Sequence, residues 1–343
     1  MMKRFLKRAL KYILILCVVL FVVGCLLSIR KTPDTFTYGV SFSKFHSDEL
    51  GINWKDAYTA ILDDLGVRHF RLSAHWPMVE PEQNVFDWSV LDQQMNMARD
   101  RGADVILVVG RRTPGWPECH TPEWADELEK QDGGVGAGSD YNKALDAYIT
   151  AVVNRYKDYP NLKMWQVENE PFLSVFATAP CATYDPKRLP EEIDMVHKLD
   201  PNHKVLVTDS GEISTWYSAS HEGDEFGTSI YLYIWQHAFG PMRYPIGPWF
   251  FRIKQNLLNW FVTDKHPLAI EVQAEPWLLT PIASAPIDEQ LKQMNIDRFK
   301  EIVDFVHKAS FSEQYYWGAE WWYYMKQNGH PEFWDFAKTL YKQ

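Results

Sequence analysis

Hydrophobic and polar positions alternate with two different periods along most of the chain after residue 35. Short apolar runs, typical of buried parallel strands, are followed by longer stretches in which apolar residues recur every three or four positions. The apolar runs cover residues 36–42, 69–76, 104–110, 162–167, 204–209, 228–235, 267–273 and 312–318. The pattern therefore predicts eight strands that alternate with helices.

The helical stretches between these runs carry recognisable end signals. Helices are predicted over residues 53–65, 88–100, 144–156, 191–199, 250–261, 287–309 and 332–341, with Gly66 and Gly102 just after the first two. Such an alternation favours a closed (β/α)8 barrel over an open doubly wound sheet. The first strand is not followed by a glycine-rich phosphate loop, which argues against a dinucleotide-binding domain. We predict that residues 32–343 form one barrel domain.

Residues 1–31 have a separate pattern. A basic stretch precedes an apolar run from Ile13 to Ile29, and Arg30 and Lys31 follow it. The run is just long enough to cross a bilayer, and the charge bias predicts a cytoplasmic N-terminus. A lipoprotein cleavage box ending at Cys25 and a conventional cleaved signal peptide are the alternatives. The apolar run continues past Cys25, which favours an uncleaved anchor, and all three alternatives place the barrel outside the cytoplasm, at the cell surface or in the periplasm.

The charge of the predicted domain restricts its partners. Seven of the 35 Lys and Arg residues lie in residues 1–31, which leaves 28 basic against 45 acidic residues, a net charge of −17. A domain this acidic is poorly suited to binding nucleic acid. The chain also has 15 Trp and 17 Tyr, whose flat rings suit sugar faces as well as a core.

The four cysteines fall into two groups. Cys17 and Cys25 lie in the apolar run, so Cys119 and Cys181 are the only pair in the predicted domain. A pair in an oxidising compartment predicts a disulfide, and two unrelated buried thiols are the alternative. With so few cysteines and no clustered histidines, a metal site is not expected.

Carboxylates follow two of the predicted strands. Asn169 and Glu170 come directly after residues 162–167, and Glu271 lies in the seventh run, with Glu275 four positions later. In a (β/α)8 barrel, groups at the carboxyl ends of the strands meet at one mouth. Two carboxyl groups about 5 Å apart there can act as nucleophile and acid/base in a glycosidase that retains configuration.

Other polar and aromatic residues are predicted at the same mouth. Glu168 shares strand parity with Glu170, and we expect it to form a salt bridge with Arg71 or a similar base rather than to act in catalysis. The remaining candidates are Arg71, His75 and Trp76 near the second strand, Tyr231 and Tyr233 in the sixth, and Trp317, Glu320, Trp321 and Trp322 near the eighth.

The segments WQVENEP, IEVQAEPW and RLSAHWPMVEPEQNVFDWSVLD together resemble the clan A glycoside hydrolases, (β/α)8 enzymes that include families 5 and 42. The resemblance spans essentially the whole chain after residue 31. It implies that Glu170 is the acid/base, that Asn169 binds substrate and that Glu271 is the nucleophile. It further implies that Arg71 and Tyr231 support the nucleophile, with no metal or organic cofactor.

The resemblance leaves some assignments open. The segment after Glu271 departs from the family 5 pattern, so Glu275 is the alternative nucleophile. Trp76, Trp317 and Trp321 are candidate substrate-binding residues or core residues. The expected partners are a carbohydrate substrate and, through residues 1–31, a membrane; the chain is expected to be monomeric. A glycan-binding barrel without activity, and a transglycosylase that uses the same residues, are the alternative functions.

Overall fold

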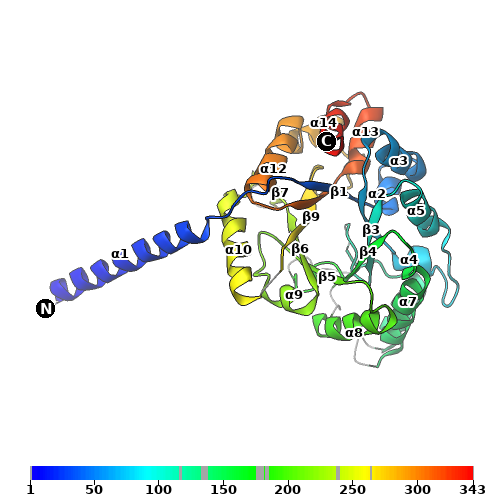
Figure 1. Cartoon of the computed structure of the whole chain (residues 1–343), viewed down its shortest axis with the longest axis horizontal. Helices are drawn as coiled ribbons and strands as arrows, with labels where there is room; N and C mark the ends of the chain where they lie inside the picture. Colours follow the sequence, from blue (N-terminus) through cyan, green and yellow to red (C-terminus); the bar gives the residue numbers. More distant parts are fainter. Residues whose placement is uncertain are drawn as a thin grey trace.

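The computed structural model describes residues 2–115, 118–132, 138–174, 181, 185–236, 240–262 and 265–342. Eight parallel strands close into a barrel, in the order β1-β10-β9-β6-β5-β4-β3-β2 (Figure 1). These strands are β1 (Thr37–Phe42), β2 (His69–Ser73), β3 (Asp104–Val109), β4 (Leu162–Val167), β5 (Val205–Asp209), β6 (Glu225–Ile230), β9 (Leu268–Gln273) and β10 (Glu313–Trp317). The predicted (β/α)8 barrel is therefore confirmed.

The strands are apolar along most of their length because both of their faces are covered. Inside the barrel, a cluster of buried side chains fills the space between opposite strands: Ile106, Met164, Leu206, Leu268, Ile270 and Tyr315. Gly39 on β1 makes room for this filling, since a Cβ atom there would lie 2.5 Å from the ring of Tyr315. Outside the barrel, the apolar faces of the surrounding helices pack on the strands and form the main core.

The helices form a ring around the barrel (Figure 1). In the described residues they are α2 (Lys44–Glu49), α3 (Trp54–Ala60) continued by the π-helical η1 (Ile61–Leu65), α4 (Trp76–Val79), α5 (Ser89–Arg99), α6 (Glu123–Asp132), α7 (Asp140–Tyr156), the 3-10 turn η3 (Pro186–Arg188), α8 (Leu189–Leu199), α9 (Tyr217–Glu222), α10 (Pro248–Phe261), the 3-10 turn η4 (Ile282–Ser284), α11 (Ile287–Gln293), α12 (Ile296–Lys308), α13 (Ala319–Gln327) and α14 (Glu332–Tyr341). Gly66 ends the first of these predicted helices in the left-handed conformation, with φ 82°, which glycine adopts without strain.

Two predicted elements are wrong in their extent. The sixth apolar run divides into β6 and a separate strand β7 (Tyr233–Gln236), which pairs antiparallel with β8 (Gly240–Arg243) outside the barrel. The Gln273 side chain explains the division, because it hydrogen-bonds both the N–H and the C=O of Tyr233. The predicted helix 287–309 is two helices, because the Asn295 side chain accepts from the N–H of Arg298 and starts α12 anew.

The N-terminal helix α1 (Met2–Leu27) extends away from the barrel and meets it beside α10 (Figure 1). Its segment Arg8–Leu27 has a mean hydropathy of 2.8 and none of it is buried. By length and composition alone, this segment can cross a membrane.

Candidate active site

The backbone after β4 turns sharply and sets the positions of the predicted acid/base and its neighbours. Glu168 and Glu170 both adopt left-handed backbone conformations, with φ values of 59° and 46°. This conformation is unfavourable for residues other than glycine, and such strained positions are enriched at active sites. The N–H of Glu170 donates to the hydroxyl of Thr208 on β5, 3.0 Å away, which holds the turn against the neighbouring strand.

Glu271 on β9 is held by two of the residues that the sequence predicted. Arg71 Nη1 donates to Glu271 Oε2 over 2.6 Å, and the Tyr231 hydroxyl donates to Glu271 Oε1 over 2.8 Å. Arg71 is fully buried, whereas the Glu271 side chain keeps 12% of its surface exposed. Both oxygens of this carboxylate are therefore fixed by donors while its accessible part faces solvent.

Arg71 also positions Asn169, which is a predicted substrate-binding residue. Its Nη2 donates to Asn169 Oδ1 over 2.7 Å, and its Nε donates to Gln166 Oε1 over 2.8 Å. The Thr208 hydroxyl also bonds Asn169 Oδ1, at 3.3 Å. Because Oδ1 is held by these donors, the Asn169 amide keeps its NH₂ group for an acceptor. Gln166, in the strand itself, was missed by the sequence analysis because a strand-interior glutamine carries no functional signal.

Glu170 lies in a different electrostatic environment. The Ser229 hydroxyl donates to its Oε1 over 2.6 Å. Burial raises the pKa of Glu170 well above its usual value, and the negative charges of Glu118 and Glu271 add to this, while the Ser229 hydrogen bond opposes it. A carboxyl group whose pKa is raised keeps its proton to higher pH than an ordinary glutamate and can give it to a leaving oxygen.

Glu168 lies against Arg111 and Arg112 rather than Arg71, the first of the bases that the sequence suggested for it. Its carboxylate accepts hydrogen bonds from the backbone N–H groups of Arg111 and Arg112, at 2.7 and 2.6 Å. Gly110 permits this approach, because a Cβ atom there would lie 2.4 Å from Glu168 Oε1. Burial raises the pKa of Glu168 to about 7, although these two hydrogen bonds oppose the rise. The strand alternation that paired Glu168 with Glu170 does not apply here, because β4 ends at Val167, before Glu168.

Glu275, the alternative nucleophile, belongs to a separate network. It bonds the ring Nε2 of His46 and the indole Nε1 of Trp317, each at 2.7 Å. Burial alone would lower the pKa of His46, but the charge and hydrogen bond of Glu275 raise it well above the usual value. Both Glu275 oxygens are thus engaged by the His46 ring and the Trp317 indole rather than by Arg71 and Tyr231.

The predicted tryptophans lie in different places. Trp317 ends β10, beside Glu275, and keeps 7% of its surface exposed. Trp76 and Trp321 are fully buried in the main core, where their indole N–H groups donate to Glu80 and Gln290 respectively. This corrects the expectation that all three could contact substrate, since Trp76 and Trp321 have no exposed surface.

The loop after β3 adds a carboxylate that the sequence analysis did not single out. Glu118 forms an ion pair with Arg112, whose Nη1 also donates to the C=O of Leu173 just beyond Glu170. The next residue forms the Cys119–Cys181 disulfide, with the two Cα atoms 5.2 Å apart, as predicted. The disulfide joins the loops after β3 and β4, so a contact between segments remote in sequence brings Glu118 toward the mouth.

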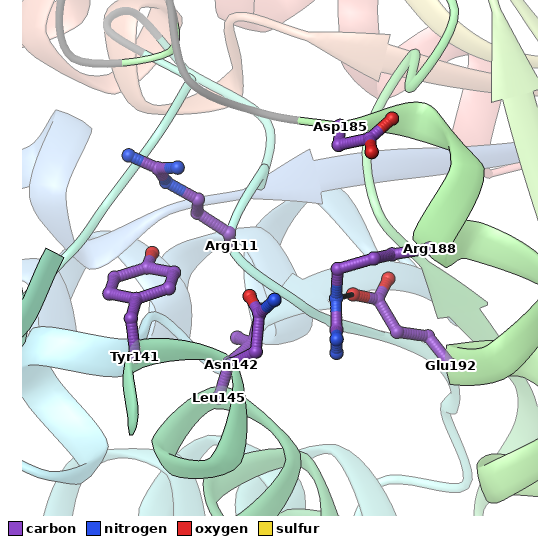
Figure 2. Close-up of a pocket in the computed structure, with 7 residues that line it drawn as sticks. All are labelled: Arg111, Tyr141, Asn142, Leu145, Asp185, Arg188 and Glu192. Atoms are coloured by element: carbon purple, nitrogen blue, oxygen red, sulfur yellow. Dashed lines mark hydrogen bonds and ion pairs between the residues drawn. The ribbon is translucent and has the colours of Figure 1, made fainter. Parts of the chain in front are cut away.

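The cavity shown in Figure 2 lies outside this site. It is lined by Arg111, Tyr141, Asn142, Leu145, Asp185, Arg188 and Glu192, between α7 and α8. Its volume of about 10 Å³ is enough for one water molecule and too small for a sugar. Over the described residues, no group of three or more His, Cys, Asp or Glu side chains could hold a metal ion.

The closed (β/α)8 barrel is the fold of glycoside hydrolases of known structure. Two solved structures illustrate the similarity of fold. A family 5 enzyme, GH5_18 from Streptomyces cattleya, has a TM-score of 0.57 at 15% identity, over 82% of this chain and 70% of that chain. The β-galactosidase from Halorubrum lacusprofundi has a TM-score of 0.54 at 18% identity, over 82% and 52% of the two chains.

Sequence comparison points to one family of glycoside hydrolases. Residues 52–186 match the model of glycoside hydrolase family 42, described as β-galactosidase. The β-galactosidase bgaB of Geobacillus kaustophilus is 32% identical over 106 residues, or 28% of this chain and 16% of that protein. The β-galactosidase Bga of Halorubrum lacusprofundi is 30% identical over 128 residues, or 32% and 17%. The chain thus matches less than a fifth of the length of these two relatives.

The family match includes Arg71, Asn169 and Glu170 but ends before β9. The role of Glu271 consequently depends on geometry alone.

Proposed function

We propose that this chain is a retaining β-glycosidase that is anchored in a membrane by α1, with its barrel outside the cytoplasm. The observation that carries the proposal is the contrast between two carboxyl groups at one barrel mouth. Glu271 is bound by a guanidinium and a phenol, whereas Glu170 is buried near other negative charges and has a raised pKa. Environments that differ in this way assign one group as nucleophile and the other as acid.

In the first step, the Glu271 carboxylate attacks the anomeric carbon of the sugar. The bond from that carbon to the leaving oxygen breaks, and Glu170 gives its proton to this oxygen. Arg71 and Tyr231 hold Glu271 in place for attack, and Arg71 also fixes Asn169, whose NH₂ group donates to a hydroxyl of the sugar. The products are the free leaving group and a glycosyl ester of Glu271.

In the second step, Glu170 acts as a base. Formation of the ester removes the negative charge of Glu271, which is one of the charges that raise the pKa of Glu170. The pKa of Glu170 therefore falls when a base is needed. Glu170 accepts a proton from water, the hydroxide attacks the anomeric carbon, and the sugar leaves with its original configuration while Glu271 is restored as a carboxylate.

The relatives suggest which substrates to test first. The matched proteins are β-galactosidases by name, so an aryl β-galactoside heads a panel that also includes aryl β-glucosides, β-mannosides and β-xylosides. Removal of a catalytic acid/base typically costs 10²- to 10⁴-fold in rate. We expect losses of roughly that size or more in Glu170→Gln and Glu271→Gln.

A trapping experiment separates the candidate nucleophiles. A 2-deoxy-2-fluoro aryl glycoside of the active sugar should leave a glycosyl group on the Glu271 peptide, identified by mass spectrometry. A label on the Glu275 peptide would transfer the role of nucleophile to that residue. Wild-type protein that binds a glycan but neither turns over nor traps any member of the panel would favour the glycan-binding alternative. Products with a sugar acceptor in place of water would favour the transglycosylase.

The proposed location is supported by two features. The span Arg8–Leu27 suits a bilayer, and the Cys119–Cys181 disulfide suits an oxidising compartment. The test is carbonate extraction of membranes from the native host, followed by protease treatment of intact cells or spheroplasts. We expect the protein to stay in the membrane pellet and its barrel to be cleaved from outside; release by carbonate would refute the anchor.

A further inference from the structure

Helix α10 has a buried face and an exposed face with opposite properties. Phe251, Gln255 and Leu258 are buried against the barrel. Trp249 and Trp260, eleven residues or about three turns apart, lie on one side of the helix, and both are more than half exposed, at 52% and 69%. We call Trp249, Ile253, Asn256 and Trp260 the outer stripe, because their spacing of four, three and four residues places them on one face.

The composition of α10 differs from that of the rest of the domain. Its sequence, PWFFRIKQNLLNWF, contains two basic residues and no acidic residue, although residues 32–343 carry 45 acidic side chains. Phe261, at the end of the helix, adds a further large apolar side chain that is 66% exposed. Exposed Trp and Phe side chains on a helix without negative charge are typical of surfaces that meet a lipid headgroup layer.

The outer stripe is also where the N-terminal helix meets the barrel. The Asn256 Nδ2 donates to the C=O groups of Leu27 and Ile29, at 2.7 and 3.0 Å, and Arg30 Nη1 donates to Asn256 Oδ1 over 3.0 Å. Leu27 is the last residue of the apolar span. These three hydrogen bonds therefore fix the end of the span at the middle of the outer stripe.

The direction of α10 completes the geometry. In Figure 1, α10 runs across the end of α1, on the side of the barrel that faces α1, and the ring of helices is seen along the barrel axis. If α1 crosses a bilayer, α10 then lies along the bilayer surface. Arg30 and Lys31 come directly after the span, at the depth of the headgroups, where long basic side chains at a helix end reach the interface.

We infer that the outer stripe of α10, with Phe261, binds the lipid headgroup layer and holds the barrel on its side, with its axis roughly parallel to the membrane. The inference rests on the proposed anchoring by α1 and deepens it: the barrel is docked on the bilayer and does not hang from a free tether. The mouth of the barrel then opens along the membrane surface, toward glycans that lie beside it.

Depth-dependent quenching tests this orientation with the full-length chain in vesicles of equal parts phosphatidylcholine and phosphatidylglycerol. Bimane is attached to single cysteines introduced as Trp249→Cys or Trp260→Cys, in a background with Cys17→Ala and Cys25→Ala. Leu16→Cys, in the middle of the span, reports insertion of α1. Val85→Cys, which is 52% exposed in the loop between α4 and α5 across the barrel from α1, is the control.

We expect nitroxide-labelled headgroups to quench bimane at residues 249 and 260, and nitroxides deep in the acyl chains to quench it at residue 16, with neither quenching residue 85. The docked orientation would be refuted if bimane were quenched at residue 16 but were quenched no more at residues 249 and 260 than at residue 85. That result would leave the anchor intact. No quenching at 16 would refute the anchor as well. Cysteine cross-links between two copies at residue 260, without lipid quenching there, would assign the stripe to a dimer and overturn the inference.

A second variant tests the hydrogen bonds to the span. Asn256→Ala should lower the headgroup quenching at residue 260 while leaving the quenching at residue 16 unchanged. Asn259→Ala, exposed on the same helix, is the matched control and should change neither. Equal quenching at 260 in wild type and Asn256→Ala would show that the contact with the span does not orient the barrel.

Discussion

Two substitutions beside Glu170 should move the pH profile in opposite directions. Glu170 acts while protonated, so activity is present below its pKa and is lost as the pH rises through it. The charge of Glu118 raises this pKa and the hydrogen bond from Ser229 lowers it. Glu118→Gln should therefore move the basic limb of kcat/KM to lower pH, and Ser229→Ala should move it to higher pH.

The size of each shift follows from the contact that is removed. The Ser229 hydrogen bond is 2.6 Å long and buried, and a hydrogen bond to a charged acceptor contributes about 1.5–3 kcal/mol. The shift measures only the excess over the bond to the protonated carboxyl, which contributes about 0.5–1.5 kcal/mol. At about 1.4 kcal/mol per pH unit, removal of the bond should therefore move the basic limb up by about one unit. In Glu118→Gln, Arg112 keeps its positive charge, so its attraction for ionised Glu170 remains while the repulsion from Glu118 is removed.

The assay is kcat/KM for an aryl glycoside across the basic limb, at constant ionic strength, for wild type and the two variants. The carboxyl groups of Glu118, Glu170 and Glu271 interact, so the limb reports the apparent pKa of the cluster. Circular dichroism at each pH controls for unfolding. Shifts of both variants in the same direction, or a fixed limb in two active and folded variants, would refute the assignment of Glu170 as the acid.

Three further predictions follow from neighbouring contacts. Tyr231→Phe should lower kcat/KM by about 10- to 100-fold, because a hydrogen bond that positions the Glu271 carboxylate is lost. Tyr233, whose hydroxyl bonds Glu301 outside the mouth, is the control, and Tyr233→Phe should change kcat/KM less than about threefold. Equal losses in the two variants would contradict this prediction. Glu275→Gln should lower the free energy of unfolding by about 1–3 kcal/mol, measured in urea, because buried His46 loses its closer carboxylate and keeps only Glu49, at 3.2 Å. Fluoroglycoside labelling of Glu271 should persist. Reduction of the Cys119–Cys181 disulfide, which spans 62 residues, should cost about 2–4 kcal/mol and lower the thermal midpoint; an unchanged midpoint after complete reduction would contradict this.

The sequence was sufficient to predict the barrel because parallel strands covered on both faces must be apolar along most of their length. β3 and β5 illustrate this, because their sequences, DVILVV and VLVTD, are mostly apolar and are buried along nearly their whole length. The order of the strands then places every carboxyl end at one mouth, which is why Glu170, Glu271, Arg71 and Tyr231 could be grouped before the structure was known.

The sequence was insufficient wherever side chains from different segments decide the outcome. Whether Trp76 lines a cleft or a core depends on the helices packed over it, and Tyr141, Tyr148 and Trp124 surround it here. The break after β6 depends on the Gln273 side chain from the neighbouring strand. Glu118 reaches the site through a loop held by a disulfide and an ion pair, and no periodic pattern encodes such a contact.

The same barrel edge can give its two carboxyl groups different tasks because different strands supply their neighbours. Arg71 comes from β2 and binds both Glu271 on β9 and Asn169 after β4, so one buried cation aligns the proposed nucleophile with the residue proposed to bind the sugar. It does not bond Glu170, whose carboxyl instead receives the neutral hydroxyl of Ser229 from β6. Ser229 is the register partner of Glu271, so the strand beside the proposed nucleophile carries the donor for the proposed acid. Exchanging the partners of the two carboxyl groups would therefore require changes at Arg71 on β2 and at Ser229 and Tyr231 at the end of β6. Single substitutions should impair one role without transferring it to the other.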